Sequence, residues 1–394
     1  MRPKEIRPQI YSVGTVDWDR RLFDALIPLP DGTSYNSYLI RGSEKTALID
    51  TVDPTMKDVL MRHLDELDVR NIDYLIAHHA EQDHSGAIPY VLEKYPQAKV
   101  VVTSRCKGML IDLLMIPEEK FITVDDMETI SLGDRTLEFI HAPWVHWPET
   151  MLTYLKEDKI LFPCDLFGSH LATTNLYVTD EGQVYEAAKR YYAEIMMPFH
   201  TNIEKHLERL AGYELDIIAP SHGPMYDKPS FILEAYRRWV FEPLKNIVVL
   251  PYISMHGSTQ RMVEYLVAAL AQKGVSVKQF NLTVTDIGRL AMALLDAATM
   301  VVGVPTVLVG PHPNVAYAAF LANALRPRLQ FVSIIGSYGW GSKAVEQLKG
   351  MIPNLKVEVL DPVISKGFPK EADFQALDNL ASTIAQKHKE HGFA

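Results

Sequence analysis

The chain has 394 residues, of which 47% are hydrophobic and 22% are charged, a globular composition that can bury large cores and that excludes intrinsic disorder. Its formal net charge of −10, without a long run of Lys or Arg, excludes the basic footprint of a nucleic-acid-binding protein. No stretch reaches the ~18 uninterrupted apolar residues of a membrane helix, and the start MRPKEIRPQIYSVG lacks the apolar core of a signal peptide, so we expect a cytoplasmic protein without a membrane partner.

The first part of the chain predicts stacked sheets flanked by helices. Short alternating or apolar runs are typical of strands separated by turns. These runs are residues 34–40, 45–50, 99–104, 135–142 and 159–165. Residues 189–210 are rich in helix formers and lead to another apolar strand, LDIIAPSHG. The pattern changes near Pro243, which predicts two domains, 1–246 and 247–394.

The second part alternates regularly between strands and helices. The predicted strands are residues 246–253, 275–282, 298–306, 329–339 and 356–364. The helices that follow them begin near Ser258, Asp286, Asn314, Ser342 and Lys370. Such repetition predicts a parallel sheet covered on both faces. Five strands in this order match a flavodoxin-like doubly wound domain, whose ligand sits outside the carboxyl ends of the strands.

A set of seven side chains predicts a metal site in the first part. Its members are His79, Glu81, Asp83, His84, His146, Asp165 and His222. Four of them crowd into the run AHHAEQDHSG, directly after the strand-like residues 74–77, so they would project from a loop at a strand end. His222 also follows a predicted strand, which places it on the same face.

The number and chemistry of these ligands favour two iron ions. Seven ligands are too many for one tetrahedral zinc but suit two adjacent ions that share a carboxylate. Imidazoles mixed with three carboxylates and no cysteine make a moderately hard site, which suits iron or manganese, and we favour iron. For any one histidine alone, a satisfied hydrogen bond in the core or at the surface is the commoner role. The ordered series argues against that alternative.

The two cysteines, Cys106 and Cys164, exclude a disulfide framework and a four-cysteine iron site within this chain. Cys164 lies beside Asp165, yet we expect it to be a small buried filler of the core.

Three loops at the carboxyl ends of the second set of strands predict an FMN site. The first, Ser254–Thr259, opens a helix whose N–H groups and dipole favour a terminal phosphate. It lacks a Walker lysine and a Gly-x-Gly-x-x-Gly turn, which favours FMN over ATP or NAD. A hydroxyl-rich helix cap is the alternative. The other two loops follow the third and fourth predicted strands, 298–306 and 329–339, and could flank the flat ring system of a flavin. The candidate residues are Ser254, Met255, His256, Gly257, Ser258, Thr259, Pro305, Thr306, Ser337, Tyr338, Gly339, Trp340 and Gly341.

Over nearly its whole length the chain resembles the flavodiiron proteins, which join a metallo-β-lactamase-like αββα sandwich to a flavodoxin-like domain. The matching motifs are Thr33-Ser34-Tyr35-Asn36-Ser37-Tyr38, His79-x-Glu81-x-Asp83-His84-Ser85-Gly86, His146-Trp147-Pro148, Asp165-x-Phe167-Gly168-x-His170 and Ser221-His222-Gly223-Pro224. Hydrolases of that sandwich fold usually carry a histidine where this chain has Glu81. Exchanging an imidazole for a carboxylate moves a site from zinc towards iron.

The resemblance implies a division of the ligands. One iron is held by His79, Glu81 and His146, the other by Asp83 and His222, and Asp165 bridges them. Members of the family differ on whether the residue matching His84 binds iron or yields its place to water. Tyr191, Tyr192, His170 and Trp147 are candidates for the layer around the irons, where aromatic packing and proton donation are the two possible roles.

The resemblance also implies the activity: electrons pass from an external donor through FMN to the diiron centre, which reduces dioxygen to water, nitric oxide to nitrous oxide, or both. The donor would be a separate rubredoxin or a reduced deazaflavin. A head-to-tail homodimer, or a dimer of dimers, would bring each flavin to the partner's irons. Two departures bear on these expectations. Residues 307–312 are apolar where the family has small polar residues, which predicts an apolar flavin environment, and Asp24 replaces a frequent histidine.

Two other functions fit parts of the pattern. A hydrolase of the metallo-β-lactamase class would use a metal-bound hydroxide on an ester, amide or phosphodiester. Glu81 and the flavin loops argue against it. A flavin-bearing electron carrier with a docking domain would tolerate the loss of metal ligands, but all the expected positions are filled.

Overall fold

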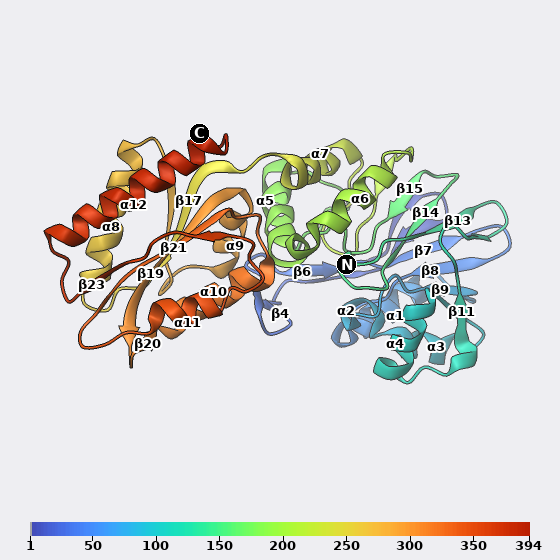
Figure 1. The fold of residues 1–394 in the computed structure, drawn as a ribbon. Coiled ribbons are helices and arrows are strands. Elements are labelled where there is room, and N and C mark those ends of the chain that lie inside the picture. Colours follow the sequence, from blue (N-terminus) through green and yellow to red (C-terminus); the bar gives the residue numbers. More distant parts are fainter. Residues whose placement is uncertain (1) are drawn as a thin grey trace. The chain divides into compact units, whose positions relative to one another are not determined.

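The computed structural model describes residues 2–394, which divide into two compact units. The first unit runs to Tyr192 and includes Phe199–Val240, and the second comprises Ala193–Pro198 and Phe241–Ala394. Figure 1 draws the first unit mainly in blue to green and the second in yellow to red. The predicted boundary after residue 246 falls inside strand β17, Lys245–Tyr252, and stays a prediction.

Two sheets form the body of the first unit. The larger has the order β1-β2-β7-β8-β9-β10-β11, with parallel pairing from β8 to β11, and the smaller has the order β12-β13-β14-β15-β16. Their strands are β1 Lys4–Arg7, β2 Ile10–Ser12, β7 Tyr38–Arg41, β8 Thr46–Ile49, β9 Tyr74–Ile76, β10 Lys99–Val102, β11 Phe121–Thr123, β12 Thr129–Ser131, β13 Thr136–His141, β14 Met151–Leu155, β15 Ile160–Phe162 and β16 Ile217–Ile218. Two small ribbons pair β3, Thr15–Asp17, with β6, Thr33–Tyr35, and β4, Leu22–Phe23, with β5, Ile27–Pro28.

The period-two pattern of the strands explains how these sheets stack. Along β7 and β8, Ile40 and Ile49 point into the core that also contains Phe139 and Phe162 of the smaller sheet. Leu48, which directly precedes Ile49 on β8, points to the opposite face of the sheet and into the core beneath the helices. Both faces of the larger sheet are therefore buried.

Helices cover the outer faces and complete the predicted αββα sandwich. The larger sheet packs against α1 Lys57–Glu66, α3 Ile88–Lys94 and α4 Ser104–Leu114, while α2 Gln82–Ser85 is a single turn. The later helices are α5 Glu181–Tyr191, α6 His200–Leu210 and α7 Pro229–Phe241. Figure 1 shows α6 and α7 on the side of β13 to β15, and Arg209 of α6 donates a hydrogen bond to the His141 carbonyl of β13 at 3.2 Å.

The predicted single strand over residues 34–40 is wrong, because the structure breaks it into β6 and β7. Asn36 lies between them and turns its polar groups to the loop after β16. Its backbone N–H bonds the Ser221 carbonyl at 2.8 Å, and its side-chain amide donates to the carbonyls of Pro220 and Gly223, each at 2.8 Å. The break ties the N-terminal strands to the loop that carries His222.

The second unit confirms the predicted doubly wound parallel sheet, with strand order β18-β17-β19-β21-β22 and β23 also paired to β21. Its other strands are β18 Ser276–Asn281, β19 Ala297–Val307, β20 Gly310–Pro311, β21 Phe331–Tyr338, β22 Glu358–Val359 and β23 Val363–Lys366. Its helices are α8 Ser258–Gln272, α9 Ile287–Asp296, α10 Pro313–Leu325, α11 Ala344–Gly350 and α12 Glu371–Glu390. One face buries α9, α10 and α11, and the other buries α8 and α12.

The predicted fifth strand, 356–364, is divided into β22 and β23. Pro362 stands in the gap and has no N–H to offer to the ladder, so pairing stops before it and resumes at Val363.

A buried histidine fastens the last helix to this sheet. His388 of α12 lies 2.6 Å from Thr299 Oγ1 through Nε2 and 2.8 Å from Asn246 Oδ1 through Nδ1. Burial, helped by the charge of His391, lowers the pKa of His388 from 6.5 to about 4. The folded protein therefore keeps this ring neutral at a pH where the unfolded chain protonates it.

Because the folded pKa is depressed, the stability that His388 contributes is complete above pH 6.5 and is lost as the pH falls towards 4. We predict that the protection factors of the α12 backbone amides, which divide out the pH dependence of intrinsic exchange, fall between pH 7 and pH 5 in the wild type. His388→Gln should lose this pH dependence, and the exposed His391→Gln should keep most of it. Equal pH dependence in the wild type and His388→Gln would contradict the assignment.

Candidate metal centre and flavin site

The fold brings all seven predicted metal ligands to one end of the two sheets. They lie in the loop after β9 and in α2, in the β13–β14 connection, and in the loops after β15 and β16. None of their side chains is more than 15% exposed. Imidazoles and carboxylates therefore meet in a place that is largely closed to water.

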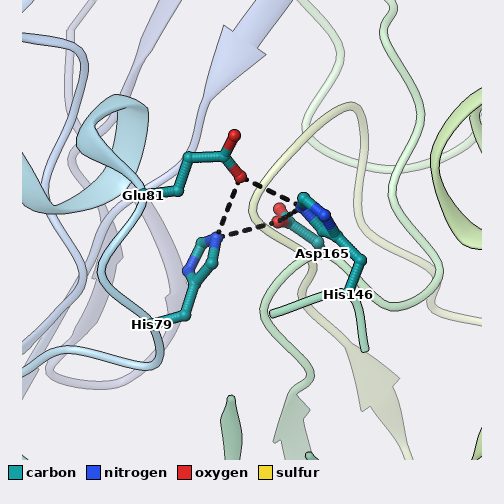
Figure 2. A group of neighbouring side chains, drawn as sticks. All are labelled: His79, Glu81, His146 and Asp165. Atoms are coloured by element: carbon teal, nitrogen blue, oxygen red, sulfur yellow. Dashed lines mark hydrogen bonds and ion pairs between the residues drawn. The ribbon is translucent and has the colours of Figure 1, made fainter. Parts of the chain in front are cut away.

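Four atoms face one point in the first half of this cluster (Figure 2). His79 Nε2 lies 3.3 Å from Glu81 Oε2 and 3.2 Å from Asp165 Oδ2. His146 Nε2 lies 3.0 Å and 3.3 Å from the same two oxygens. Ligand atoms that share a cation at about 2.1 Å are separated by roughly 3 Å, so this spacing fits a metal ion.

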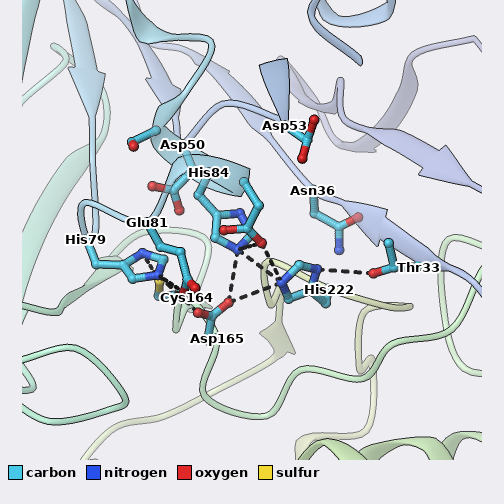
Figure 3. A network of polar contacts seen from close by, with 12 residues as sticks. Thr33, Asn36, Asp50, Asp53, His79, Glu81, His84, Cys164, Asp165 and His222 are labelled. Atoms are coloured by element: carbon cyan, nitrogen blue, oxygen red, sulfur yellow. Dashed lines mark hydrogen bonds and ion pairs between the residues drawn. The ribbon is translucent and has the colours of Figure 1, made fainter. Parts of the chain in front are cut away.

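In the second half, ligand atoms of His84, Asp165 and His222 lie close together (Figure 3), and Asp83 adds a second carboxylate. Asp83 Oδ2 lies 3.1 Å from His84 Nε2 and 3.2 Å from His222 Nε2. Asp165 Oδ1 lies 3.1 Å from His84 Nε2 and 3.5 Å from His222 Nε2. Asp165 therefore turns one oxygen to each half, as a bridging carboxylate does.

His84 is part of this half, but its ring is held differently from that of His222. The two Nε2 atoms are 3.1 Å apart. Behind the cluster, His222 Nδ1 lies 2.6 Å from the Ser34 carbonyl. The Nδ1 of His84 is buried and has no hydrogen-bond partner within residues 2–394. The position of His84 fits that of a metal ligand. Its Nδ1, however, lacks a hydrogen bond such as the one to the Ser34 carbonyl that orients the ring of His222.

The buried carboxylates of the cluster are stabilised by nearby positive charge, either protonated imidazoles or bound cations. Burial alone lowers the pKa of an imidazole and raises that of a carboxyl group. Here that penalty is outweighed: hydrogen bonds and charges from Asp165 and Glu81 raise the pKa of His146 to about 9, and the neighbouring imidazoles hold the pKa of Asp165 well below its usual range. Asp83, with both oxygens buried, accepts no hydrogen bond from the described residues. Three clustered carboxylates, of which Asp83 and Asp165 have buried oxygens without a hydrogen-bond partner among the described residues, fit a pair of iron ions.

Three of the four predicted surrounding residues lie against the cluster and one does not. His170 has its ring centroid 4.6 Å from that of His222, and Tyr191 stands 4.8 Å from His170. The ring of Trp147 is 5.8 Å from His79. Tyr192 instead packs among aromatic residues of α7, 5.2 Å from Tyr236 and 5.3 Å from Trp239. Successive helical residues point in different directions, so Tyr191 and Tyr192 cannot both face the cluster.

The β4–β5 hairpin approaches the second half. The ring of Phe23 is 5.2 Å from His170 and 6.4 Å from His222. The next two residues, Asp24 and Ala25, turn through left-handed backbone angles, with φ 49° and 53°. Burial and the charges of Glu81 and Asp83 raise the pKa of Asp24. Asp24, the residue that departs from the family pattern, therefore interacts electrostatically with the carboxylates of the cluster.

The ligand loops are fixed to one another by a close approach at Gly223, the residue after His222. Its N–H donates to Ser34 Oγ at 2.7 Å, and its φ is +79°. A Cβ atom there would lie 2.1 Å from Ser169 Oγ, closer than atoms can approach. Only glycine lets the loop after β16 reach the loop after β15.

Cys164 is buried, as expected of a small filler of the core, but sequence reasoning missed its contact with His79. Its Sγ lies 3.2 Å from His79 Nδ1, on the side of the ring opposite the cluster. The available signal was its place between a strand end and Asp165, which does not reveal a contact with a residue 85 positions earlier.

In the second unit, the three predicted loops line one cavity of about 200 Å³. Its lining comprises Ser254, Met255, His256, Ser258, Thr259, Pro305, Thr306, Ser337, Tyr338, Gly339 and Gly367. Gly257, Trp340 and Gly341 were predicted but do not line it, and Trp340 is 77% exposed. Gly367 was missed, although a glycine after the last strand, here with φ +78°, was a usable signal.

Hydroxyl groups tie this cavity together. Ser254 Oγ accepts the N–H groups of Gly257 and Gln260 at 3.2 and 3.1 Å, so it caps α8 as the alternative explanation requires. Thr259 Oγ1 and Ser337 Oγ, from different loops, lie 3.0 Å apart at the cavity. The start of α8 and these hydroxyls can bind a phosphate.

The apolar departure at residues 307–312 does not enter the cavity lining. Val307 pairs with Gly310 in a tight hairpin, and Leu308 at its tip is 87% exposed. The segment turns outward because β19 continues past the sheet into β20. The expectation of an apolar flavin environment finds no support in these residues.

No helix within residues 2–394 is long and apolar enough to cross a membrane.

Known proteins resemble the chain over its whole length. A family model described as "ODP family beta lactamase" matches residues 33–223. The chain is 36% identical over 396 residues to a nitric oxide reductase of Moorella thermoacetica, an alignment that covers 98% of this chain and 99% of that protein. Its fold is similar to rubredoxin oxygen:oxidoreductase of Desulfovibrio gigas, with a TM-score of 0.93, 30% identity and complete coverage of both chains. A flavodiiron protein of Giardia intestinalis gives a TM-score of 0.87 at 28% identity, covering 98% of this chain and 96% of that one.

These similarities extend across both units, whose sheets carry a cluster of histidines and carboxylates in one and a hydroxyl-lined cavity in the other. The chain belongs to the flavodiiron proteins and is an oxidoreductase.

Proposed function

We propose that this chain takes electrons from an external donor and, with bound FMN and two irons, reduces dioxygen to water, nitric oxide to nitrous oxide, or both. The observation that carries the proposal is the shared carboxylate of Asp165, whose Oδ2 faces His79 and His146 while Oδ1 faces His84 and His222. A buried carboxylate divided in this way suits two metal ions a few ångströms apart, which can engage one small molecule together.

The proposed ligands follow the two halves of the cluster. The first ion takes His79, Glu81 and His146, the second takes Asp83, His84 and His222, and Asp165 joins both. Bound iron would supply one-electron chemistry and open positions for a small oxidant, which imidazole and carboxylate ligands support in both oxidation states. The inclusion of His84 rests on its Nε2, which lies within 3.1 Å of Asp83, Asp165 and His222.

The proposed FMN site is the cavity of the second unit. The phosphate would lie at the start of α8, where backbone N–H groups and the hydroxyls of Ser258 and Thr259 favour an anion. Pro305, Thr306 and the loop Ser337–Gly339 would flank the ring system. The site sits at the carboxyl ends of β17, β19 and β21, as expected for a ligand of a doubly wound sheet.

The comparisons suggest both substrate and donor. A relative named nitric oxide reductase and one named rubredoxin oxygen:oxidoreductase support nitric oxide and dioxygen as substrates, and a rubredoxin-type protein as donor. The hydrolase alternative is not favoured, because the names of these relatives describe redox reactions. Glu81 also stands where hydrolases of this fold usually have a histidine. We place the protein in the cytoplasm.

A kinetic experiment tests the function. The iron- and FMN-loaded protein is reduced without oxygen and mixed in a stopped-flow instrument with dioxygen or with nitric oxide. Fast reoxidation by at least one gas, with water or nitrous oxide as product, is expected. If neither gas reoxidises a protein that contains two irons and one FMN, the proposal is wrong.

Replacement of Glu81 by alanine should abolish both reactions while FMN stays bound. Glu81 places Oε2 3.0 Å from His146 Nε2 and 3.3 Å from His79 Nε2, so its loss opens the first half of the cluster. Iron per chain is measured by elemental analysis, FMN by absorbance, and folding by circular dichroism. An active Glu81→Ala protein with two irons would contradict the ligand assignment.

A matched control variant should show the opposite pattern, with loss of FMN and retention of iron. The double variant Thr259→Val/Ser337→Ala removes the two hydroxyls that meet at the cavity and should lose FMN affinity while retaining two irons. Because the two clusters belong to different units, each variant should leave the other cofactor unchanged.

We further propose a head-to-tail homodimer as the active form. Electron transfer between FMN and iron requires a short distance, and within one chain the two sites lie in separate units. A two-fold arrangement would bring each flavin to the irons of the partner, and its symmetry would supply both contacts at once.

This arrangement predicts that activity follows dimer concentration. Light scattering and turnover are measured on the same dilution series, and the specific activity is expected to fall as monomer forms. A monomer with full specific activity would exclude the head-to-tail dimer.

A further inference from the structure

Cys164 occupies an unusual position at the base of the metal cluster. It follows β15, directly precedes Asp165, and is 1% exposed. Its backbone adopts a left-handed conformation, with φ 55°, which non-glycine residues adopt rarely. The turn thereby delivers a buried sulfur to one side of the peptide and the shared carboxylate to the cluster.

The sulfur meets a ring that already has a role. His79 Nε2 faces Glu81 and Asp165, and on the opposite edge of the same ring Nδ1 lies 3.2 Å from Cys164 Sγ. An imidazole offers a metal the lone pair of one nitrogen only if the other carries the hydrogen. In this tautomer Nδ1–H donates to the sulfur, which is its hydrogen-bond acceptor.

The other histidines show that this partner is distinctive. His222 finds a backbone carbonyl, that of Ser34, at 2.6 Å from Nδ1. His84 finds no partner for Nδ1 within residues 2–394. Carboxylates, carbonyls and water are the usual acceptors behind a ligating histidine. A large, polarisable sulfur behind His79 therefore gives the first half of the cluster a different electronic setting from the second.

A rigid base holds the sulfur in place. The adjacent His78 has Nδ1 2.6 Å from Asp50 Oδ2, and its Nε2 is 2.8 Å from Thr153 Oγ1. Asp50 also accepts the His78 backbone N–H at 2.9 Å. Ligand atoms of Asp50, His78 and Cys164 all lie within 4.8 Å of one another. Both nitrogens of His78 have partners, so its ring is fixed beside Cys164.

We propose that Cys164 is a positioning residue: it accepts the Nδ1–H bond of His79, fixes the tautomer and orientation of that ring, and tunes the iron of the first half alone. This inference rests on the proposed diiron function. Cys164 touches no reacting atom in this scheme and acts through His79.

Three variants test the inference in the full-length protein loaded with ⁵⁷Fe and FMN. Cys164→Ala removes the acceptor, Cys164→Ser keeps a smaller one, and Cys106→Ala removes the other buried cysteine, which lies in α4. Mössbauer spectra report each iron separately, and competition with a chelator reports iron affinity. FMN content and circular dichroism report folding.

For Cys164→Ala we expect one of two equally populated iron signals to change and the other to stay, with iron affinity roughly 10–100-fold lower. Cys164→Ser should restore most of the wild-type spectrum, and Cys106→Ala should match the wild type. A general packing defect would instead change both irons, and serine would give no selective rescue.

The outcomes separate this inference from the proposed function. A wild type that binds no iron pair overturns both. A wild type with two irons whose spectrum and affinity are unchanged in Cys164→Ala overturns only the role of Cys164. Equal losses in Cys106→Ala and Cys164→Ala also overturn it. If Cys164→Ala does not fold, Cys164→Val, which is close to cysteine in size and also lacks an acceptor, takes its place: a spectrum altered at one iron supports the inference, and an unaltered spectrum at full affinity overturns it.

Discussion

The structure depends on the burial of three carboxylates beside four imidazoles at the ends of two sheets. Charges withdrawn from water cost several kcal/mol each unless opposite charges and good geometry compensate, and removal of one partner typically costs about 3–5 kcal/mol. Asp165 is at the centre of this balance, because each of its oxygens serves a different half. Without cations, protons on His79, His84 and His146, whose pKa values the neighbouring carboxylates raise, compensate the carboxylates, whereas a pair of irons would take over that role and release them. Metal loading and folding of the first unit are therefore linked.

The sandwich fold meets this constraint by bringing short loops from several strands to one edge. Strands buried on both faces cannot shift by one residue without turning apolar side chains to the wrong core, so their ends are well placed supports. The second unit uses the same principle with different chemistry. There the carboxyl ends of parallel strands present hydroxyls and a helix start instead of imidazoles. Each unit thus builds one site from loops, on a rigid sheet that fixes their spacing.

Much of this could be predicted from the sequence. Period-two runs located most strands, and the alternation after residue 246 predicted the parallel sheet with its five helices. The candidate ligand set could be proposed because histidines and carboxylates cluster at predicted strand ends, and the structure brings these side chains together. Other features depend on contacts between distant residues, which have no local signature. Asn36 breaks its strand because three partners lie near residue 222, and Cys164 owes its contact to His79. Tyr191 and Tyr192 are equivalent candidates in the sequence, but in the structure Tyr191 packs against His222 and Tyr192 packs against Tyr236.

The close approach at Gly223 has a consequence for how such a protein can diverge. The loops that bear Asp165 and His222 touch so tightly that neither can accept a bulkier residue without moving a ligand. A change in reactivity that leaves these two loops in place can come from substitutions where packing is looser. The β4–β5 hairpin, whose tip residues Asp24 and Leu26 are not fully buried, is such a place: it reaches the cluster and contributes none of its seven candidate ligands. Substitutions in this hairpin can therefore change the surroundings of the cluster without moving the loops that carry Asp165 and His222.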